Sequence, residues 1–332
     1  MTRASGTLFG LACGDALGAP TEFLTVPEIE RRYGAGGPRD LAGDPAPVTD
    51  DTQMALAVAR ALLEGTDRVR LEPALRDHFV RWWASPDNDR APGMTCLQAC
   101  ERLADGLPWR RATSESSKGC GANMRVAPVG LAPGLDDAHR AGIAQFQSAL
   151  THGHPTALAA SELTAFAVHR LRGGMRLDDL PAALRQRCAE QRTTYHEDWL
   201  DDLWARPGAT GPEEFIARGW DECAAALDAL DRALARPDRR ADPCLATGAG
   251  WVAEEALATA LHCVLLFPDE PVEALVRAAT TSGDSDSIAC LAGAFAGAAH
   301  GLGAWPAGWV ERVEHADELA ALGRRWDADE DH

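Results

Sequence analysis

Two acidic clusters carry residue types that could hold a metal ion. The first is TDDT at residues 49–52, and the second is SGDSDS at residues 282–287. Each cluster combines carboxylates with hydroxyls, and hard cations such as Mg²⁺ prefer oxygen ligands. We therefore expect these two clusters, which lie far apart in the chain, to meet in space and bind hard metal ions.

The first cluster also has a purely structural interpretation. Thr49 precedes a run of apolar residues with helical spacing, so it is a candidate N-cap with Asp50 and Asp51 in the first turn. Carboxylates are favoured there by the helix dipole. Taken alone, this cluster is an acidic helix start, and the metal-site hypothesis depends on the second cluster.

The second cluster requires a loop or a helix start. Asp284 and Asp286 are two positions apart, and residues with that spacing do not share a helix face. Gly283 before them allows a sharp entry of the chain. A calcium-binding loop is excluded, because Ala289 and Phe295 stand where such a loop needs glycine and glutamate.

Two further segments carry polar groups of interest. Pro20 ends a predicted helix and leaves Glu22 in a loop, which Asp15 is a candidate to brace by hydrogen bonds. From this segment alone, Glu22 is an ordinary exposed carboxylate. Residues 117–125 contain a Gly-x-Gly turn whose N–H groups could cradle a diphosphate. That turn is a weak signal alone, since it matches neither the Walker nor the Rossmann fingerprint.

The elements that must position these groups are predicted to be helices. Alanine and leucine dominate, β-branched runs are nearly absent, and apolar residues recur with a helical period in several segments. We expect an all-α fold, a compact orthogonal bundle of a dozen or more helices. Because one site needs both clusters, we predict a single domain over residues 1–332. Residues 187–242 are a possible peripheral insertion, either a cap over the substrate or a helical hairpin.

Composition excludes several other classes. The net charge of −18 disfavours general nucleic-acid binding. No apolar run reaches the roughly 18 residues of a membrane span, and no signal peptide is recognised. The nine cysteines include no CxxC pair, so we expect reduced, mostly buried thiols and a cytoplasmic location.

Together, these motifs resemble the ADP-ribosylglycohydrolase family, which includes the dinitrogenase-reductase-activating glycohydrolases and the vertebrate ADP-ribosylhydrolases. The resemblance extends over nearly the whole chain, from residue 9 to about residue 310. The matching segments stand in family order at residues 10–22, 49–52, 119–128, 151–152, 250–257 and 282–287.

The resemblance implies an all-α fold that binds two Mg²⁺ ions, with Mn²⁺ as a possible substitute. The positions that match metal ligands are Thr49, Asp50, Asp51, Asp284, Asp286 and Ser287. Glu22 matches a flexible glutamate that approaches the metals and assists proton transfer. The expected catalytic residues are Glu22, Asp50, Asp51 and Asp286.

The same resemblance implies a binding site for ADP-ribose. Ser117, Gly119 and Gly121 match the diphosphate loop, which also holds Cys120, and His152 matches a histidine that contacts ADP-ribose. The expected substrate-binding residues are Ser117, Gly119, Cys120, Gly121, His152 and Trp251. For Trp251, stacking on a ligand and burial in the core remain alternatives.

Three features depart from the family pattern. Lys118 stands where some relatives have an aromatic or other residue, and Asn123 stands where small residues are common. Whether these two side chains alter the contacts to the ligand stays open. Residues 187–242 do not match the better-known members, which leaves the specificity for the leaving group open.

The resulting hypothesis is a Mg²⁺-dependent ADP-ribosylhydrolase. It would cleave the C1″ glycosidic bond of ADP-ribosylated protein and release ADP-ribose, with arginine-linked substrates favoured. One alternative substrate is serine-linked or other O-linked ADP-ribose, or O-acetyl-ADP-ribose. Two other classes of function are a non-catalytic ADP-ribose-binding protein on the same fold and a phosphohydrolase that cleaves the pyrophosphate.

Overall fold

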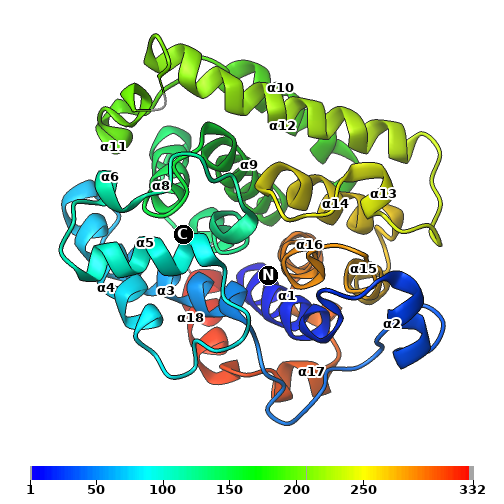
Figure 1. Ribbon diagram of the computed structural model, residues 1–332. Helices are drawn as coiled ribbons and strands as arrows, with labels where there is room; N and C mark the ends of the chain where they lie inside the picture. Colours follow the sequence, from blue (N-terminus) through cyan, green and yellow to red (C-terminus); the bar gives the residue numbers. More distant parts are fainter. Residues whose placement is uncertain (1, 207, 329–332) are drawn as a thin grey trace.

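The computed structural model describes residues 2–206 and 208–328, and the regular elements of this part of the chain are helices (Figure 1). It contains eighteen α-helices, five short 3-10 helices and isolated β-bridges, with no strand among the described residues. The all-α prediction is therefore confirmed. Residues 1, 207 and 329–332, which belong to the predicted domain or its insertion, lie outside the described residues.

The long helices are α1 (Arg3–Gly18), α3 (Asp50–Glu64), α4 (Arg68–Trp83), α5 (Met94–Ala104), α8 (Asp137–Ala149), α9 (Pro155–Arg172), α10 (Leu180–Gln191), α12 (Pro212–Leu234), α14 (Ala253–Leu266), α16 (Ser285–His300) and α18 (Ala316–Ala328). The shorter α-helices are α2 (Val26–Tyr33), α6 (Trp109–Ala112), α7 (Ala127–Leu131), α11 (Glu197–Leu200), α13 (Cys244–Thr247), α15 (Pro271–Ala278) and α17 (Ala307–Arg312). The 3-10 turns are η1 (Ala19–Thr21), η2 (Cys120–Ala122), η3 (Leu177–Asp179), η4 (Leu203–Ala205) and η5 (Leu302–Ala304).

The pair formed by α1 and α16 lies at the centre of the fold, and its helices come from opposite ends of the chain (Figure 1). Every residue of α1 from Ala4 onward is buried. A Cβ atom on Gly14 would lie only 2.0 Å from the carbonyl oxygen of Ala289, so the two backbones touch directly. This contact brings the end of α1, and the loop after it, against the first turn of α16.

The remaining helices surround this pair. Helix α9 packs against α7, α8 and α12, and the buried apolar side chains form one continuous cluster. The long helices α10 and α12 lie together along one edge of the molecule, outside α8, α9 and α14 (Figure 1). The 187–242 region is thus an edge layer, and the single-domain assignment stays a prediction.

The structure also bears on the expectations for the cysteines and for membrane-spanning helices. All nine cysteines lie in the described residues and are free, and all except Cys244 are buried, as predicted. Among the described residues, no helix is both long and apolar enough to cross a membrane.

Candidate active site

The first acidic cluster forms the start of α3, as its sequence predicts. Thr49 is the N-cap and accepts a hydrogen bond from the backbone N–H of Asp51 at 3.4 Å. Asp50 and Asp51 occupy the first turn and are buried. An acidic helix start and a set of metal ligands are therefore compatible descriptions of the same residues.

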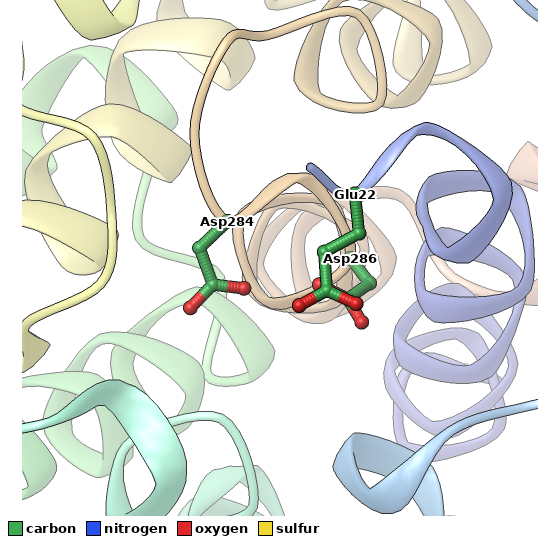
Figure 2. Close-up of side chains that lie close together, drawn as sticks. All are labelled: Glu22, Asp284 and Asp286. Atoms are coloured by element: carbon green, nitrogen blue, oxygen red, sulfur yellow. The ribbon is translucent and has the colours of Figure 1, made fainter. Parts of the chain in front are cut away.

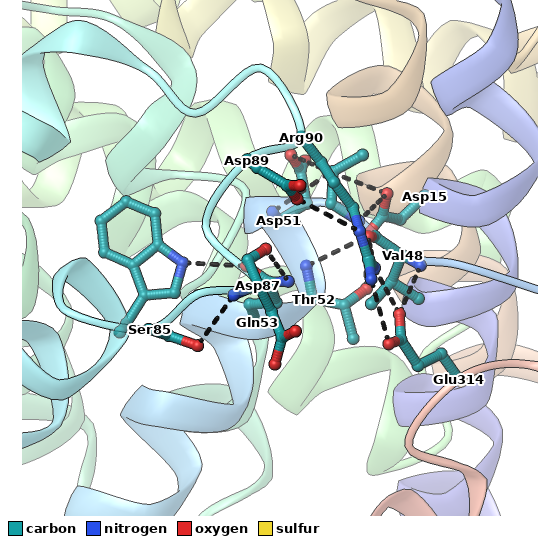
Figure 3. A network of polar contacts seen from close by, with 12 residues as sticks. Asp15, Val48, Asp51, Thr52, Gln53, Ser85, Asp87, Asp89, Arg90 and Glu314 are labelled. Carbon is teal, nitrogen blue, oxygen red and sulfur yellow. Dashed lines mark hydrogen bonds and ion pairs between the residues drawn. The ribbon is translucent and has the colours of Figure 1, made fainter.

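A buried carboxylate on α1 fixes this turn in place. Asp15 accepts hydrogen bonds from the N–H of Thr49 at 3.0 Å and the N–H of Thr52 at 3.1 Å. It also accepts from both threonine hydroxyls, at 2.8 and 2.5 Å (Figure 3). Asp15 thus braces the start of α3, whereas the sequence suggested that it braces the loop of Glu22. No local pattern could reveal this partner, since the two segments are distant in sequence.

The second acidic cluster forms the start of α16. Asp284 is the N-cap residue, and Asp286 lies in the first turn, where it accepts a hydrogen bond from the N–H of Ser287 at 3.0 Å. A Cβ on Gly283 would meet the carbonyl oxygen of Ala249 at 1.9 Å, so only glycine fits this entry. The predicted helix start is confirmed, whereas Gly283 is required for the close approach to Ala249 rather than for backbone freedom, because its φ is not in the left-handed region.

The two clusters line one cavity together with Glu22. Glu22, Asp284 and Asp286 each offer an oxygen atom, and these three atoms lie within 4.8 Å of one another (Figure 2). Asp50, Asp51 and Ser287 line the same cavity, which has a volume of ≈ 280 Å³. Thr49 does not line this cavity, but its hydroxyl donates a hydrogen bond at 3.2 Å to Oδ2 of Asp51, which does.

Burial raises the pKa of every carboxyl group of this cluster, and repulsion from Asp286 acts on the others. Burial, followed by repulsion from Asp286, raises the pKa of Asp50 to about 7 and that of Glu22 to about 9. The same two causes raise the pKa of Asp51 and Asp284 well above the ordinary value. So many carboxylates in a buried space are unfavourable as anions unless positive charge compensates them.

The donor atoms fit a hard divalent cation. All of them are oxygens, from carboxylates and hydroxyls, as Mg²⁺ and Mn²⁺ prefer. The Oδ1 atom of Asp51 is buried and has no hydrogen-bond partner in the described structure. An unpartnered buried carboxylate oxygen is costly, and a bound cation would satisfy it.

The glycine-rich turn forms the opposite wall of the same cavity. Gly119, Cys120 and Gly121 line it, as do His152 and Trp251. The turn is held by the backbone of the segment before α14, since the N–H of Cys120 donates to the carbonyl of Trp251 at 3.1 Å.

Two neighbouring side chains complete this wall. Ser117 does not itself line the cavity. Its hydroxyl lies 3.0 Å from the hydroxyl of Thr95, which does line the cavity. Thr95 and Met94, at the start of α5, are lining residues that the sequence patterns did not single out.

His152 is buried and neutral. Burial, and then the nearby Arg125 charge, lower the pKa of its imidazole to about 3. Its Nδ1 atom shares a 2.8 Å hydrogen bond with the hydroxyl of Thr151, which in turn accepts from Arg125 at 2.9 Å. Arg125 is thus a positioning residue to which sequence reasoning gave no role, although it lies in the glycine-rich segment.

The two departures from the family pattern make contacts within the protein. The ammonium of Lys118 pairs with Glu222 of α12 at 2.7 Å and with Glu254 of α14. The side-chain amide of Asn123 donates to the carbonyl of Ala253 at 3.1 Å. Both side chains therefore tie the glycine-rich turn to the helices behind it, and Lys118 links it to the 187–242 region.

An aromatic pair stands at the mouth of the cavity. Phe23 and Trp251 stack with ring centroids 5.6 Å apart and planes inclined by 18°. Phe23 is 68% exposed and Trp251 is 43% exposed, so the alternative that Trp251 is buried in the core is wrong. Phe23 was missed from sequence, although an aromatic residue directly after a candidate catalytic glutamate was an available signal.

Comparisons with known proteins agree with this arrangement. The family model described as ADP-ribosylglycohydrolase matches residues 1–331. An ADP-ribosyl-[dinitrogen reductase] glycohydrolase of Rhodospirillum rubrum is 28% identical, over 94% of this chain and 90% of its own length. An ADP-ribosylarginine hydrolase Tri1 of Pseudomonas putida is 28% identical over 96% and 77%.

More distant comparisons give the same result. The human ADP-ribosylhydrolase ARH3 is 26% identical, over 98% of this chain and 92% of its own. A solved structure titled "ADP-ribosylglycohydrolase-related protein complex" superimposes with a TM-score of 0.67 at 27% identity, covering 98% of this chain and 96% of the other. The chain therefore belongs to the ADP-ribosylglycohydrolase family and is a hydrolase of glycosidic bonds.

Proposed function

We propose that this protein is a Mg²⁺-dependent ADP-ribosylhydrolase that releases ADP-ribose from ADP-ribosylated protein, with arginine-linked substrates preferred. The observation that carries the proposal is the approach of the Glu22, Asp284 and Asp286 oxygens to within 4.8 Å in one cavity. The glycine-rich turn lines that same cavity. A carboxylate cluster and a glycine-rich turn in one cavity suit a substrate that joins a sugar to a diphosphate.

Six side chains would hold two Mg²⁺ ions, or Mn²⁺ in their place. When bound, such cations orient the hydroxyls of a ribose and lower the pKa of a water molecule. The proposed ligands are Thr49, Asp50, Asp51, Asp284, Asp286 and Ser287, of which Asp51 has a buried oxygen atom without a partner.

Glu22 is the proposed acid and base. It lies on the loop after α1, at the edge of the carboxylate cluster, and it is half-buried. In the reaction the C1″ bond to the leaving atom breaks, water supplies the hydroxyl at C1″, and the leaving atom gains a proton. A carboxyl group at this position can take the proton from the water and return it to the leaving group.

The other wall of the cavity would hold the diphosphate and orient the ADP-ribose. A Cβ on Gly121 would lie 3.1 Å from the imidazole of His152, so glycine leaves room for the ring beside the turn. The neutral imidazole of His152 can form hydrogen bonds without adding a charge. Trp251, exposed at the mouth, offers a ring face for stacking.

The preference for arginine is supported by two relatives whose names state that activity, the Tri1 hydrolases of Pseudomonas putida and Serratia proteamaculans.

The alternative substrates are serine-linked or other O-linked ADP-ribose and O-acetyl-ADP-ribose. A non-catalytic ADP-ribose-binding protein is disfavoured by the convergence of the carboxylates. The expected partner is therefore an ADP-ribosylated protein. A location in the cytoplasm and the absence of nucleic-acid binding stay predictions.

The test is the release of ADP-ribose from three substrates: arginine-modified protein, serine-modified protein and O-acetyl-ADP-ribose. Each is assayed with Mg²⁺ and with a chelator, and the products are separated. We expect intact ADP-ribose, most rapidly from the arginine conjugate and only with Mg²⁺. AMP as the product would instead indicate a phosphohydrolase. Binding of ADP-ribose by calorimetry without turnover of any conjugate would indicate a binding protein.

A further inference from the structure

A second cavity adjoins the first on the far side of Glu22. It has a volume of ≈ 380 Å³. Its walls come from the end of α1 and the turn after it, with Ala16, Ala19 and Pro20, and from the connector before α3, with Ala42 and Pro47. These five side chains are small and apolar, so the cavity suits a slender aliphatic group.

The two cavities share part of their lining. Glu22, Phe23 and Ala91 line both of them, so they meet at the proposed acid and base. If ADP-ribose fills the first cavity, its C1″ atom must come within reach of Glu22 for proton transfer. The group attached to C1″ then lies beside Glu22, at the entrance to the second cavity.

We propose that the second cavity binds the leaving group, and that it selects a side chain with a long aliphatic stem and a cationic head, as in arginine. This inference rests on the proposed ADP-ribosylhydrolase function and adds the class of leaving group to it. Alanine and proline walls can bury the methylene groups of such a stem. A serine or acetyl group has no stem to fill this space.

The boundary between the cavities suits a cationic head. Glu22 supplies a carboxyl group there, and Phe23 supplies a ring that is stacked on Trp251. Aromatic rings attract guanidinium groups near their faces. The arginine that lines the cavity, Arg90, has a partner for its charge in Glu314, at 3.2 Å from Nη2 to Oε1 (Figure 3). Its repulsion of a second cation is thereby reduced.

The backbone at the boundary is unusual as well. Phe23 has a φ of 63°, a region that bulky residues rarely adopt. That conformation sets the ring of an exposed residue at the meeting point of the two cavities. A costly backbone conformation beside Glu22 is consistent with a functional demand on the position of this ring.

The test fills the second cavity and leaves the first one open. Ala42 is exposed and lines the second cavity but not the first, so Ala42→Trp narrows the second cavity without replacing a residue of the carboxylate cluster. The matched control is Ala35→Trp, an exposed position of the same connector that does not line the cavity. Each variant is assayed for kcat/KM on an ADP-ribosylarginine peptide and on O-acetyl-ADP-ribose.

We expect Ala42→Trp to lower kcat/KM for the arginine peptide by ~10-fold or more, since a few methylene contacts discriminate to that extent. Turnover of O-acetyl-ADP-ribose should stay within about twofold of the parent protein, and Ala35→Trp should change neither substrate. Equal loss on both substrates, or no loss on the arginine peptide, would overturn the inference.

Two further results keep the inference separate from the proposed function. If the parent protein cleaves no ADP-ribosyl conjugate, the proposed function itself fails. If it cleaves serine-linked or acetylated ADP-ribose but not the arginine conjugate, the assignment of the second cavity and the preference for arginine fail, whereas the ADP-ribosylhydrolase activity stands. Should Ala42→Trp not fold by circular dichroism, Pro47→Phe at another exposed wall position provides the same comparison.

Discussion

Glu22 and Asp286 come from opposite ends of the chain, yet their carboxyl groups offer oxygen atoms within 4.8 Å of each other. Glu22 follows α1, and Asp286 lies in the first turn of α16. A Cβ on Gly18 would lie 2.5 Å from the carbonyl of Ser285, so the end of α1 touches the start of α16. The contact between these two backbones therefore assembles the proposed site.

Gly14→Ala should destabilise the protein and disrupt the site. Its new methyl group would lie 2.0 Å from the carbonyl oxygen of Ala289, so the helices must separate. We expect a loss of about 2–3 kcal/mol in the free energy of unfolding, the upper part of the range for overpacked cores. Urea denaturation measures it. Gly308→Ala in α17, where an added Cβ meets nothing within 4 Å, is the control and should be neutral or stabilising.

Mg²⁺ should stabilise the folded protein. Several buried carboxylates repel one another, and the Oδ1 atom of Asp51 is buried without a partner among residues 2–206 and 208–328. A cation at about 100 times its dissociation constant would add ~2.7 kcal/mol. For a chain of this length that corresponds to a rise in Tm of roughly 4 °C. Thermal melts with Mg²⁺, Mn²⁺, Ca²⁺ and EDTA check this, and equal melting in all four would contradict the metal site.

Asp286→Asn should have opposite effects on stability and activity. The pKa values of Asp50 and Asp284 are raised first by their own burial and then by the charge of Asp286, so removing this charge relieves repulsion in the metal-free protein. We expect a higher Tm without cations, a smaller rise with Mg²⁺, and a loss of activity of ~100-fold or more. The exposed Asp269→Asn is the control. A variant that keeps both the Mg²⁺ effect and full activity would exclude Asp286 as a ligand.

Local sequence rules accounted for the elements on which the site is built. Thr49 as an N-cap and the helix starts that carry the aspartates both follow from capping preferences. These preferences act within a few residues, so they can be recognised without the fold. The matching residue types of the two clusters supplied their grouping, and the family resemblance added the expected set of metal ligands.

The missed features depend on partners that are distant in the sequence. Asp15 accepts hydrogen bonds from the start of α3, and Lys118 pairs with glutamates on α12 and α14. Neither set of contacts follows from a spacing pattern in the sequence. The stacking of Phe23 on Trp251 is likewise a contact between two loops that are distant in the sequence. Such contacts are set by the packing of whole helices, which periodicity alone does not determine.

Lys118→Met should weaken substrate binding more than turnover. The ammonium of Lys118 ties the glycine-rich turn to Glu222 and to the buried Glu254. We expect KM to rise by ~10-fold with kcat nearly unchanged, because the turn loses its fixed position but the carboxylates do not. Lys118→Arg, which keeps the charge, should restore most of the affinity. An unchanged KM in Lys118→Met would show that the turn is held by its backbone bonds alone.

His152 should make the protein less stable in mild acid. Its pKa is lowered to about 3 by burial, below the ordinary value of about 6.5, so the folded state binds fewer protons than the unfolded state between these limits. The stability that comes from keeping this imidazole neutral is present above pH 6.5 and is lost as the pH falls. From pH 7 to pH 5 the parent protein should lose about 2 kcal/mol more than His152→Asn. Urea denaturation of both proteins at the two pH values, without divalent cations, measures the difference. The carboxylates are common to both proteins and cancel, so equal losses would mean that His152 is protonated in the folded state.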